Sequence, residues 1–465
     1  MSKRFMAAIG SVALAILSSS PVGASQGIAQ PIKVGNSCFT AKQLASLNGQ
    51  KLICTNVNPR LNVWKKYIAP SKTQSLATPS VAMPPVAAIQ IPDPSISSQS
   101  VFQNPQKCEL TSSVQDANLG YQRSSSWMST QGTLNIGVIY ASYLDATLNP
   151  AAIKEYETIQ EPNAAQFYKT ESYGKLSLKF VSSAKVYSIN SSTASYNLKS
   201  QTPNFNGLIS DAMNTAKSEY DFKNIDEILL VMPDQTVTQD LGAVTGANTQ
   251  FDGKTFPDSI EGAYLNPSNG QLVHPDYLTH EIGHTLGLIH PNLSGQMNQL
   301  SAGLFDAYAW DVMGWDEAVD PGFYTWEKFI FGWIDSSQVD CLDAPPDQSV
   351  TAYLSADEKS SADTKMMMVR ISDSKALVVE SHRNDAINHL SASQEGVLVY
   401  TVDVNKGSDQ GAITVIYNKP KIDAGIAKFL IGTLDQGDSV TSNGVKITVL
   451  KHSADGDFIS VTKQS

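Results

Sequence analysis

Residues 280–290 carry the side-chain types and the spacing that a catalytic metal ion requires. They read HEIGHTLGLIH, and three of the chain's seven histidines lie within them. On a helix that turns about 100° per residue, His280 and His284 lie about 40° apart, so both imidazoles can reach one Zn²⁺ ion. Glu281 lies beside them, where its carboxylate could act on a zinc-activated water without ligating the metal.

A turn after this helix would bring a third histidine to the ion. Gly287 can adopt the left-handed conformation that other residues avoid, which would end the helix and return His290 towards the metal. Three protein ligands leave a fourth position open, which is typical of catalytic zinc, whereas structural zinc prefers four protein ligands. The motif therefore predicts a site for one catalytic zinc ion, with His280, His284 and His290 as ligands and Glu281 as general base.

A second motif follows about two dozen residues later, where residues 311–315 read DVMGW. Together the two motifs resemble the metzincins, zinc proteases whose elongated histidine motif is followed by a Met-turn. The resemblance implies that Met313 forms an apolar floor beneath the zinc ligands. Some metzincins carry a transition-state tyrosine two residues after this methionine, but Trp315 occupies that position here. Tyr308 and Tyr264 are nearby candidates for a phenol donor, although a tyrosine in such a position more often serves in packing.

The resemblance can be narrowed by three further segments. Residues 167–180, 326–334 and 378–404 look like secreted bacterial metalloproteases of the immune inhibitor A type, of which gametolysin-like proteases are close relatives. The likeness runs from about Cys108 to about Val404. It implies a metzincin-like protease domain that is followed by a β-rich domain.

The elements that must position the histidines follow an α/β pattern. Pro150 begins a helical stretch that Pro162 interrupts. Alternating or short apolar runs predict strands, and helical spacing predicts one further helix. In chain order these elements are a strand at 133–142, the helical stretch, a strand or hairpin at 175–187, a helix at 208–220 and a buried strand at 226–233. We expect an α/β (α+β) catalytic domain over residues 108–344.

The last 121 residues have a different pattern. Short runs of β-forming residues alternate with turn residues, which predicts an all-β, sandwich-like domain over residues 345–465. We expect its three histidines, His382, His389 and His452, to be exposed to solvent. His274, just before the zinc motif, is also expected at the surface.

Acidic residues before the zinc motif could bind Ca²⁺, which many exported proteases need. Asp252, Asp258 and Asp276 are the candidates. Their spacing does not follow the ordered pattern of a calcium-binding loop. Calcium therefore remains only an option.

The N-terminus reads as an export signal. Lys3 and Arg4 precede an apolar run at 6–17, and small residues precede Ala24, after which we expect cleavage. An uncleaved membrane anchor is the alternative, but the run is short for a bilayer. Residues 25–68 would form a small disulfide unit and residues 69–107 a Pro/Ser-rich linker. Whether residues 25–107 are a propeptide or a retained module stays open.

Export favours disulfides among the four cysteines. Four cysteines allow three connectivities, and we favour the pairs Cys38–Cys54 and Cys108–Cys341 because the first two lie close together in sequence. Free buried thiols are an alternative. A free cysteine could also cap the zinc as an inhibitory ligand, since thiolates bind zinc well.

Composition excludes several classes of protein. The chain has 465 residues, 42% of them apolar and 17% charged, and a net charge of −11, which becomes −13 without Lys3 and Arg4. These figures argue against a disordered protein and a nucleic-acid binder. The sequence has no apolar run of membrane-spanning length after the N-terminus.

Taken together, these patterns predict a secreted zinc endopeptidase acting on proteins or peptides. One alternative is a non-catalytic protein that binds a cell surface or a glycan and retains the protease scaffold. A second alternative is a metal-dependent hydrolase of another bond. The intact Glu281 disfavours the non-catalytic reading, since a binding protein does not need a general base.

Overall fold

The protein is described by a computed structural model that divides the chain into two compact units, residues 1–88 and 89–465. The described part of the second unit comprises residues 105–114, 117–198, 203–233, 242–246, 248–263, 276–292, 310–314, 322–384, 395–418 and 432–464. In the first unit, only the backbones of three strands between residues 44 and 66 are described.

The N-terminal unit contains a small antiparallel sheet. Its strands are β1 (Leu44–Leu47), β2 (Gln50–Asn58) and β3 (Leu61–Lys66), with β2 in the middle. Cys54 belongs to β2, whereas Cys38 lies outside the described residues, so their pairing stays a prediction. The signal peptide and the linker up to residue 104 also lie outside them.

A five-stranded sheet, in the order β5-β4-β6-β10-β7, forms the frame of the region predicted to be the catalytic domain, which we call the catalytic part. The first four strands are parallel, and the short edge strand β7 is antiparallel. Their bounds are β4 (Gly132–Tyr143), β5 (Leu176–Ile189), β6 (Glu227–Met232), β7 (Ala243–Val244) and β10 (Ser259–Ala263). All six residues of β6 are buried, as the predicted apolar strand requires. The segment predicted as a strand or hairpin at 175–187 is one long strand that begins at Leu176.

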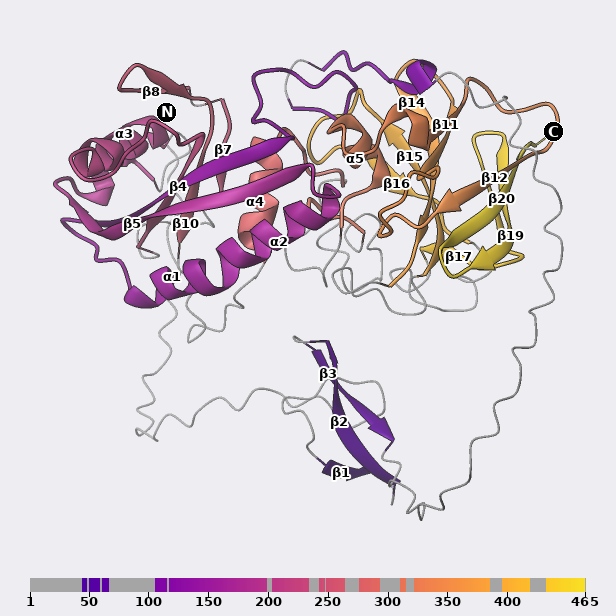
Figure 1. Ribbon diagram of the computed structural model, residues 1–465, viewed down its shortest axis with the longest axis horizontal. Coiled ribbons are helices and arrows are strands. Elements are labelled where there is room, and N and C mark those ends of the chain that lie inside the picture. The colour runs from indigo at the N-terminus through magenta and orange to yellow at the C-terminus, as the bar shows by residue number, and fades with distance from the viewer. Residues whose placement is uncertain are drawn as a thin grey trace, which may run out of the picture. The chain divides into compact units, whose positions relative to one another are not determined.

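Helices cover both faces of this sheet (Figure 1). Helix α3 (Phe205–Ala216) packs on one face, while α1 (Pro150–Glu155), α2 (Glu161–Glu171) and α4 (Tyr277–Thr285) pack on the other. Leu230 of β6 joins the α3 side, and its neighbour Leu229 joins the α4 side. None of the helices in the described ranges is long and apolar enough to cross a membrane.

The predicted interruption near Pro162 is a π-helical turn, Tyr156–Gln160, between α1 and α2. The N–H of Glu161 bonds back to the carbonyl of Tyr156, five residues earlier. This wider turn carries Gln160, whose side-chain oxygen accepts the N–H of Leu278 in the first turn of α4 at 3.2 Å. The break therefore supplies a hydrogen-bond acceptor to the start of the histidine-bearing helix.

Two sheets make up the β-rich part, and the described residues after 345 contain strands but no helix. The first sheet contains β11 (Val339–Leu342), β13 (Met366–Arg370), β14 (Lys375–His382), β15 (Gly396–Asp403), β16 (Ile413–Val415) and β17 (Thr433–Leu434). The second contains β12 (Val350–Ser355), β18 (Ser439–Ser442), β19 (Val445–Ser453) and β20 (Gly456–Lys463).

The six-stranded sheet is buried on both faces. Leu377 and Val379 of β14 join an apolar cluster with side chains of the second sheet. Ala376 and Val378 instead join the core of the catalytic part, which also contains residues of α5 (Thr325–Ile330). Burial on both faces explains why these strands read as nearly continuous apolar runs.

A buried ionic network crosses between the catalytic part and the β-rich part. The Lys328 ammonium on α5 contacts Glu171 of α2 at 2.8 Å and also pairs with Asp357. The Tyr173 hydroxyl donates to the same Asp357 carboxylate at 2.7 Å. Although burial disfavours the ammonium, the two carboxylates hold the pKa of Lys328 well above its usual range. Lys328 is therefore charged, and its side chain is only 1% exposed.

His382 corrects the expectation that the histidines of the β-rich part are exposed. Its side chain is buried, with Nδ1 2.7 Å from Glu358 and Nε2 2.8 Å from Glu380. Burial opposes its positive charge, but the two glutamates outweigh this effect and raise the pKa of His382 well above its usual range. The expectation was wrong because β14 is an interior strand, covered on both faces. His452 is partly exposed and pairs with Asp457. His274 and His389 lie outside the described residues.

The predicted disulfide Cys108–Cys341 is confirmed. It joins the short 3₁₀ helix Pro105–Cys108 to strand β11, across a sequence separation of 233 residues. The bond therefore closes the covalent loop that contains the whole catalytic part.

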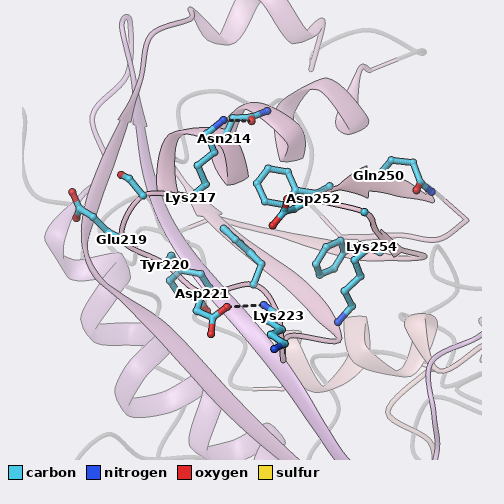
Figure 2. A pocket seen from close by; sticks show the side chains of 14 residues that line it. Asn214, Lys217, Glu219, Tyr220, Asp221, Lys223, Gln250, Asp252 and Lys254 are labelled. Atoms are coloured by element: carbon cyan, nitrogen blue, oxygen red, sulfur yellow. Dashed lines mark hydrogen bonds between the residues drawn. The ribbon is translucent and has the colours of Figure 1, made fainter.

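A surface pocket of about 940 Å³ opens on the α3 side of the five-stranded sheet (Figure 2). Asn214, residues 217–223 and most of the hairpin β8 (Thr249–Phe251)–β9 (Lys254–Phe256) line it. Buried rings such as Phe222 form its floor, and exposed charged side chains such as Asp252 form its rim. None of the predicted zinc ligands lines this pocket.

Candidate metal centre

Helix α4 has defined ends that fix the two histidines on it. The N-cap residue Asp276 makes no side-chain capping bond, and the Gln160 side chain instead accepts a backbone N–H in the first turn. At the other end Gly287 has φ +95°, the left-handed conformation that its sequence position predicts. The Gly287 N–H donates to the His284 carbonyl at 2.8 Å, and the Leu288 N–H donates to the Gly283 carbonyl at 3.0 Å. These two bonds are those of a Schellman motif, which ends the helix and redirects the chain.

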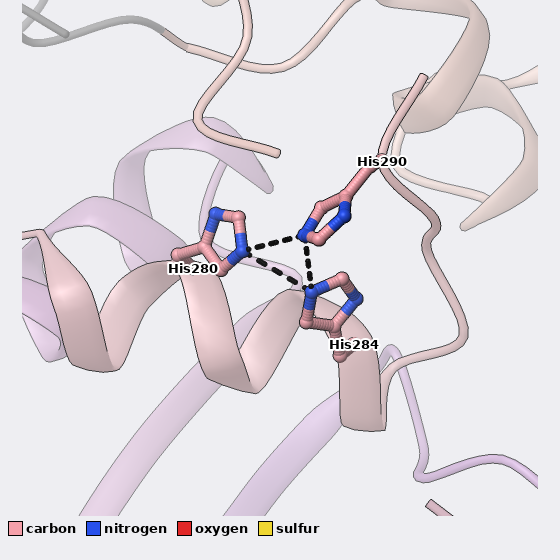
Figure 3. A group of neighbouring side chains, drawn as sticks. All are labelled: His280, His284 and His290. Carbon is pink, nitrogen blue, oxygen red and sulfur yellow. Dashed lines mark hydrogen bonds between the residues drawn. The ribbon is translucent and has the colours of Figure 1, made fainter. Parts of the chain in front are cut away.

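The three predicted ligands converge on one point (Figure 3). The Nε2 atoms of His280 and His284 are 3.1 Å apart, and that of His290 lies 3.2 and 3.1 Å from them. A tetrahedral zinc ion with Zn–N bonds of about 2.0–2.1 Å separates its ligand nitrogens by about 3.3 Å. The triangle of nitrogens thus has the size that one such ion requires.

The tautomers of the helical histidines also suit a metal. Nδ1 of His280 lies 2.8 Å from the Val312 carbonyl, and Nδ1 of His284 lies 3.0 Å from the Leu288 carbonyl. A carbonyl can only accept, so Nδ1 carries the proton in both rings. Burial, together with His290, lowers the pKa of His280 to about 4, and burial with its histidine neighbours lowers that of His284 well below its usual range. Both rings are therefore neutral at pH 7, with unprotonated Nε2 atoms.

This donor set fits zinc. Neutral imidazoles whose second nitrogen is held by a hydrogen bond are the usual nitrogen ligands of zinc in proteins. Lone pairs that face one centre repel one another, and the attraction of each lone pair to a cation at that centre outweighs this repulsion.

The third histidine is held from the β-rich part. His290 lies beyond α4, and its Nδ1 is 3.4 Å from the Asp409 carboxylate. Asp409 belongs to the loop between β15 and β16, residues 404–412, which we call the β15–β16 loop. The backbone of His290 also bonds this loop, at Ser408 and Asp409.

The Glu281 carboxylate lies against the edge strand of the sheet. Its Oε2 accepts the N–H of Ala243 in β7 at 2.7 Å, and the side chain is 8% exposed. An ideal Cβ atom on Gly242 would lie 2.9 Å from the same oxygen. Glycine at this position lets the strand pass close to the carboxylate.

Met313 lies against α4 at the level of Gly283. It is fully buried, and an ideal Cβ atom on Gly283 would lie within 2.2 Å of its sulfur. A tight turn holds it, because the Gly314 N–H donates to the Asp311 carbonyl at 2.9 Å and the Asp311 carboxylate accepts the Met313 N–H at 2.8 Å. The Asn292 amide links this turn to the His290 segment through the Gly314 carbonyl at 2.9 Å.

A buried carboxyl pair supports this turn. Burial raises the pKa of Asp311 to about 8, and burial together with Asp311 raises that of Glu327 well above its usual range. Glu327 also accepts the N–H of Tyr324 at the start of α5. The pair therefore holds at least one proton at neutral pH, which avoids two adjacent buried charges.

The other residues that the sequence singled out either lie outside the described residues or are not part of the histidine cluster. Trp315, Tyr308 and Tyr264 lie outside the described residues. Asp258 is buried and accepts the Gly246 N–H at 2.7 Å, and burial raises its pKa to about 6. In the described ranges, the groups able to hold an ion do not include the three aspartates named for Ca²⁺.

The second such group, Asp357, Glu358 and His382, is already satisfied by the protein. Asp357 is engaged by Lys328 and a tyrosine hydroxyl, and both nitrogens of His382 face carboxylates. An imidazolium has no lone pair to offer a metal. This group therefore belongs to the ionic network and not to a metal site.

Sequence reasoning missed the contacts that fix the histidines from outside the motif. Gln160, Val312 and Asp409 each bond α4 or a histidine. The predicted helix break at Pro162 pointed to the neighbourhood of Gln160, and the DVMGW motif contains Val312. No local pattern singled out Asp409, which is 119 residues away from His290.

Comparison with known proteins gives one family match. Residues 140–314 match the family model of the M12B, reprolysin-like metallopeptidases, and they run from β4 to the end of the turn around Met313. No curated protein matches the chain at a significant level. The narrower resemblance to the immune inhibitor A type stays a prediction.

Among solved structures, the chain is similar to OgpA from Akkermansia muciniphila. Wild-type OgpA in two crystal forms has 14% and 13% identity over 70% of this chain and 90% and 89% of OgpA, with a TM-score of 0.27 in each case. Catalytically inactive OgpA, in complex with an O-glycopeptide (glycodrosocin) substrate, has 13% identity over 70% of this chain and 90% of OgpA, with a TM-score of 0.26. Such low TM-scores do not establish a shared fold.

The family match coincides with the geometry of the site. The matched residues include all three histidines, Glu281 and Met313. The match supports a metallopeptidase, and hence a hydrolase that acts on proteins or peptides.

Proposed function

We propose that this chain is a secreted endopeptidase that uses one zinc ion, held by His280, His284 and His290. The observation that supports this most is the convergence of three Nε2 atoms within 3.2 Å of one another. Two of these atoms are unprotonated, because Nδ1 of their rings donates to a carbonyl. The metallopeptidase match over residues 140–314 supports the same assignment.

Glu281 acts as the general base and then as the general acid in this proposal. Zinc, when bound, supplies a Lewis acid that polarises the scissile carbonyl and acidifies water. The Glu281 carboxylate takes a proton from the attacking water and delivers it to the leaving amine. The Ala243 N–H holds Oε2 of this carboxylate, which fixes its orientation for both transfers.

Further residues have supporting roles in the proposal. Met313, which lies against α4 at Gly283, provides the apolar floor of the site. The edge strand β7 runs past Glu281, where an extended peptide could add to the sheet. Protein or peptide substrates would therefore reach the carboxylate along this edge.

The remaining parts of the chain have proposed roles outside catalysis. The signal peptide is removed after Ala24, and the small unit at 25–68 is closed by Cys38–Cys54. The linker at 69–107 joins it to the catalytic domain at 108–344. A sandwich-like domain at 345–465 completes the chain. Either flanking domain could attach the protease to a cell surface.

Zymography on casein and gelatin tests the proposal, with and without a zinc chelator. The key variant is Glu281→Gln, which keeps the shape of the side chain but removes the base. Glu219→Gln is the matched control, because Glu219 lies on the α3 side and pairs with Lys185, a half-exposed lysine. We expect Glu281→Gln to retain about one zinc per chain and to lose about 10²–10⁴-fold in turnover.

Three outcomes would count against the proposal in different ways. Near wild-type cleavage by Glu281→Gln would refute the role of Glu281. Cleavage that survives complete zinc removal would refute the metal dependence. A zinc-loaded wild-type protein that cleaves neither protein nor a peptide library would favour the non-catalytic binding protein.

A further inference from the structure

The β15–β16 loop bonds the backbone of the third histidine through both its N–H and its carbonyl. The Ser408 hydroxyl accepts the His290 N–H at 3.2 Å, and the Asp409 N–H donates to the His290 carbonyl at 3.0 Å. The Gly411 N–H donates to the Asn292 carbonyl at 2.7 Å, and the N–H of Ile413, the first residue of β16, donates to the Pro291 carbonyl at 3.1 Å. The segment that carries His290 is thus paired with the β-rich part.

His290 depends on such contacts more than the other two histidines do. His280 and His284 are fixed by the hydrogen bonds of α4. His290 follows the helix-ending Gly287 and belongs to no helix or strand. Its position must therefore be set by what lies against it.

Asp409 contacts His290 through its side chain as well as its backbone. Its Oδ2 is 3.4 Å from Nδ1 of His290, whereas the other two histidines face backbone carbonyls. Asp409 has φ +61°, a left-handed conformation that aspartate tolerates better than most residues. This conformation turns both its N–H and its carboxylate towards the same histidine.

We propose that Asp409 is a positioning residue of the zinc site, so that the β-rich part completes the metal centre. A carboxylate that accepts from Nδ1–H of a ligating histidine fixes the ring and makes Nε2 a stronger donor. The inference rests on the proposed zinc function. It adds that zinc affinity depends on a residue outside the family match, 119 residues away from His290.

Zinc competition against a chromogenic chelator tests this inference on the full chain, in a Glu281→Gln background that prevents self-digestion. The variants are Asp409→Ala, Asp409→Asn and the control Asp347→Ala, which removes an equally negative but 89% exposed side chain paired with Lys463. We expect Asp409→Ala to weaken zinc binding by about 10–100-fold and to release zinc faster. Asp409→Asn keeps an acceptor and should lose less.

The melting temperature of the zinc-free proteins separates positioning from folding. We expect Asp347→Ala to melt with the wild type, since that side chain is 89% exposed. Asp409→Ala should melt slightly lower, because alanine tolerates φ +61° less well, whereas Asp409→Asn, which tolerates it, should melt with the wild type. Equal zinc affinity in Asp409→Ala and Asp347→Ala would overturn the inference and leave the proposed function intact. If the Glu281→Gln protein binds no zinc, or if His284→Ala leaves its zinc affinity unchanged, both the inference and the proposed function are overturned.

Discussion

Gly283, between two of the proposed ligands on α4, has no room for a side chain. An ideal Cβ atom there would lie 2.2 Å from the sulfur of Met313 and 3.1 Å from its terminal methyl group. Favourable non-bonded contact needs about 3.5–4.0 Å, so in Gly283→Ala the sulfur must retreat by roughly 1.5 Å. Met313 is fully buried, and any retreat displaces its other neighbours.

Two opposing effects set the size of the change. Alanine favours a helix over glycine by about 1 kcal/mol. Overpacking a well-filled core costs about 1–3 kcal/mol. We therefore expect Gly283→Ala to lower the free energy of unfolding by up to about 2 kcal/mol, where an open helix would gain about 1 kcal/mol.

A double-mutant cycle isolates the clash. Met313→Ala alone should cost about 2–5 kcal/mol, because it opens a cavity. In the double variant the new Cβ meets no sulfur. The losses of unfolding free energy in the two single variants should therefore sum to about 1–3 kcal/mol more than the loss measured in the double variant. The assay is urea unfolding of the zinc-free Glu281→Gln chains, followed by tryptophan fluorescence. Additivity within about 0.5 kcal/mol would refute the contact between Gly283 and Met313.

Three other predictions test how the two parts of the chain are joined. Lys328→Met should cost about 3–5 kcal/mol because it leaves two buried carboxylates without their cation, whereas Lys185→Met, at an exposed lysine, should leave the free energy of unfolding nearly unchanged in the same urea assay. Cys341→Ser, which removes this disulfide and frees Cys108, should lower the free energy of unfolding by about 2–5 kcal/mol. A wild-type chain with the same unfolding midpoint with and without reductant would contradict this. His382 has a raised pKa in the folded state, so its stabilisation is complete below the unfolded-state pKa of about 6.5. Above that pH the stabilisation falls, and it is lost as pH rises through the raised folded-state pKa. His382→Gln should therefore show a flatter decline in unfolding free energy between pH 7 and 9, and parallel curves would count against the assignment.

The parts of the site that are local in sequence could be predicted from it. The spacing of His280 and His284 follows from the helical period, and Gly287 does take the left-handed conformation that its place in the motif requires. The buried strand β6 could be read from its apolar run in the same way. In each case the deciding interactions lie within a few residues of one another.

The parts that depend on tertiary contact could not be predicted. His382 reads as an ordinary polar residue at a strand end, and only the layer that covers β14 makes it a buried ion. The loop around Asp409 reads as a turn rich in glycine and polar residues, which marks a connection but not what it touches. A β-rich tail is easily taken for a separate module, although its main sheet shares a core with the catalytic part.

Each histidine at the centre is held by a different stretch of chain. His280 bonds Val312 in the turn around Met313, His284 bonds the turn that ends its own helix, and His290 bonds Asp409 in the β-rich part. The geometry that suits a metal therefore exists only when all three stretches are folded together. A truncation after residue 344 would keep the complete histidine motif and the turn, yet it would remove every contact from the β15–β16 loop to His290. Such a fragment would carry the sequence signature of a metallopeptidase with only two of its three histidines held in place.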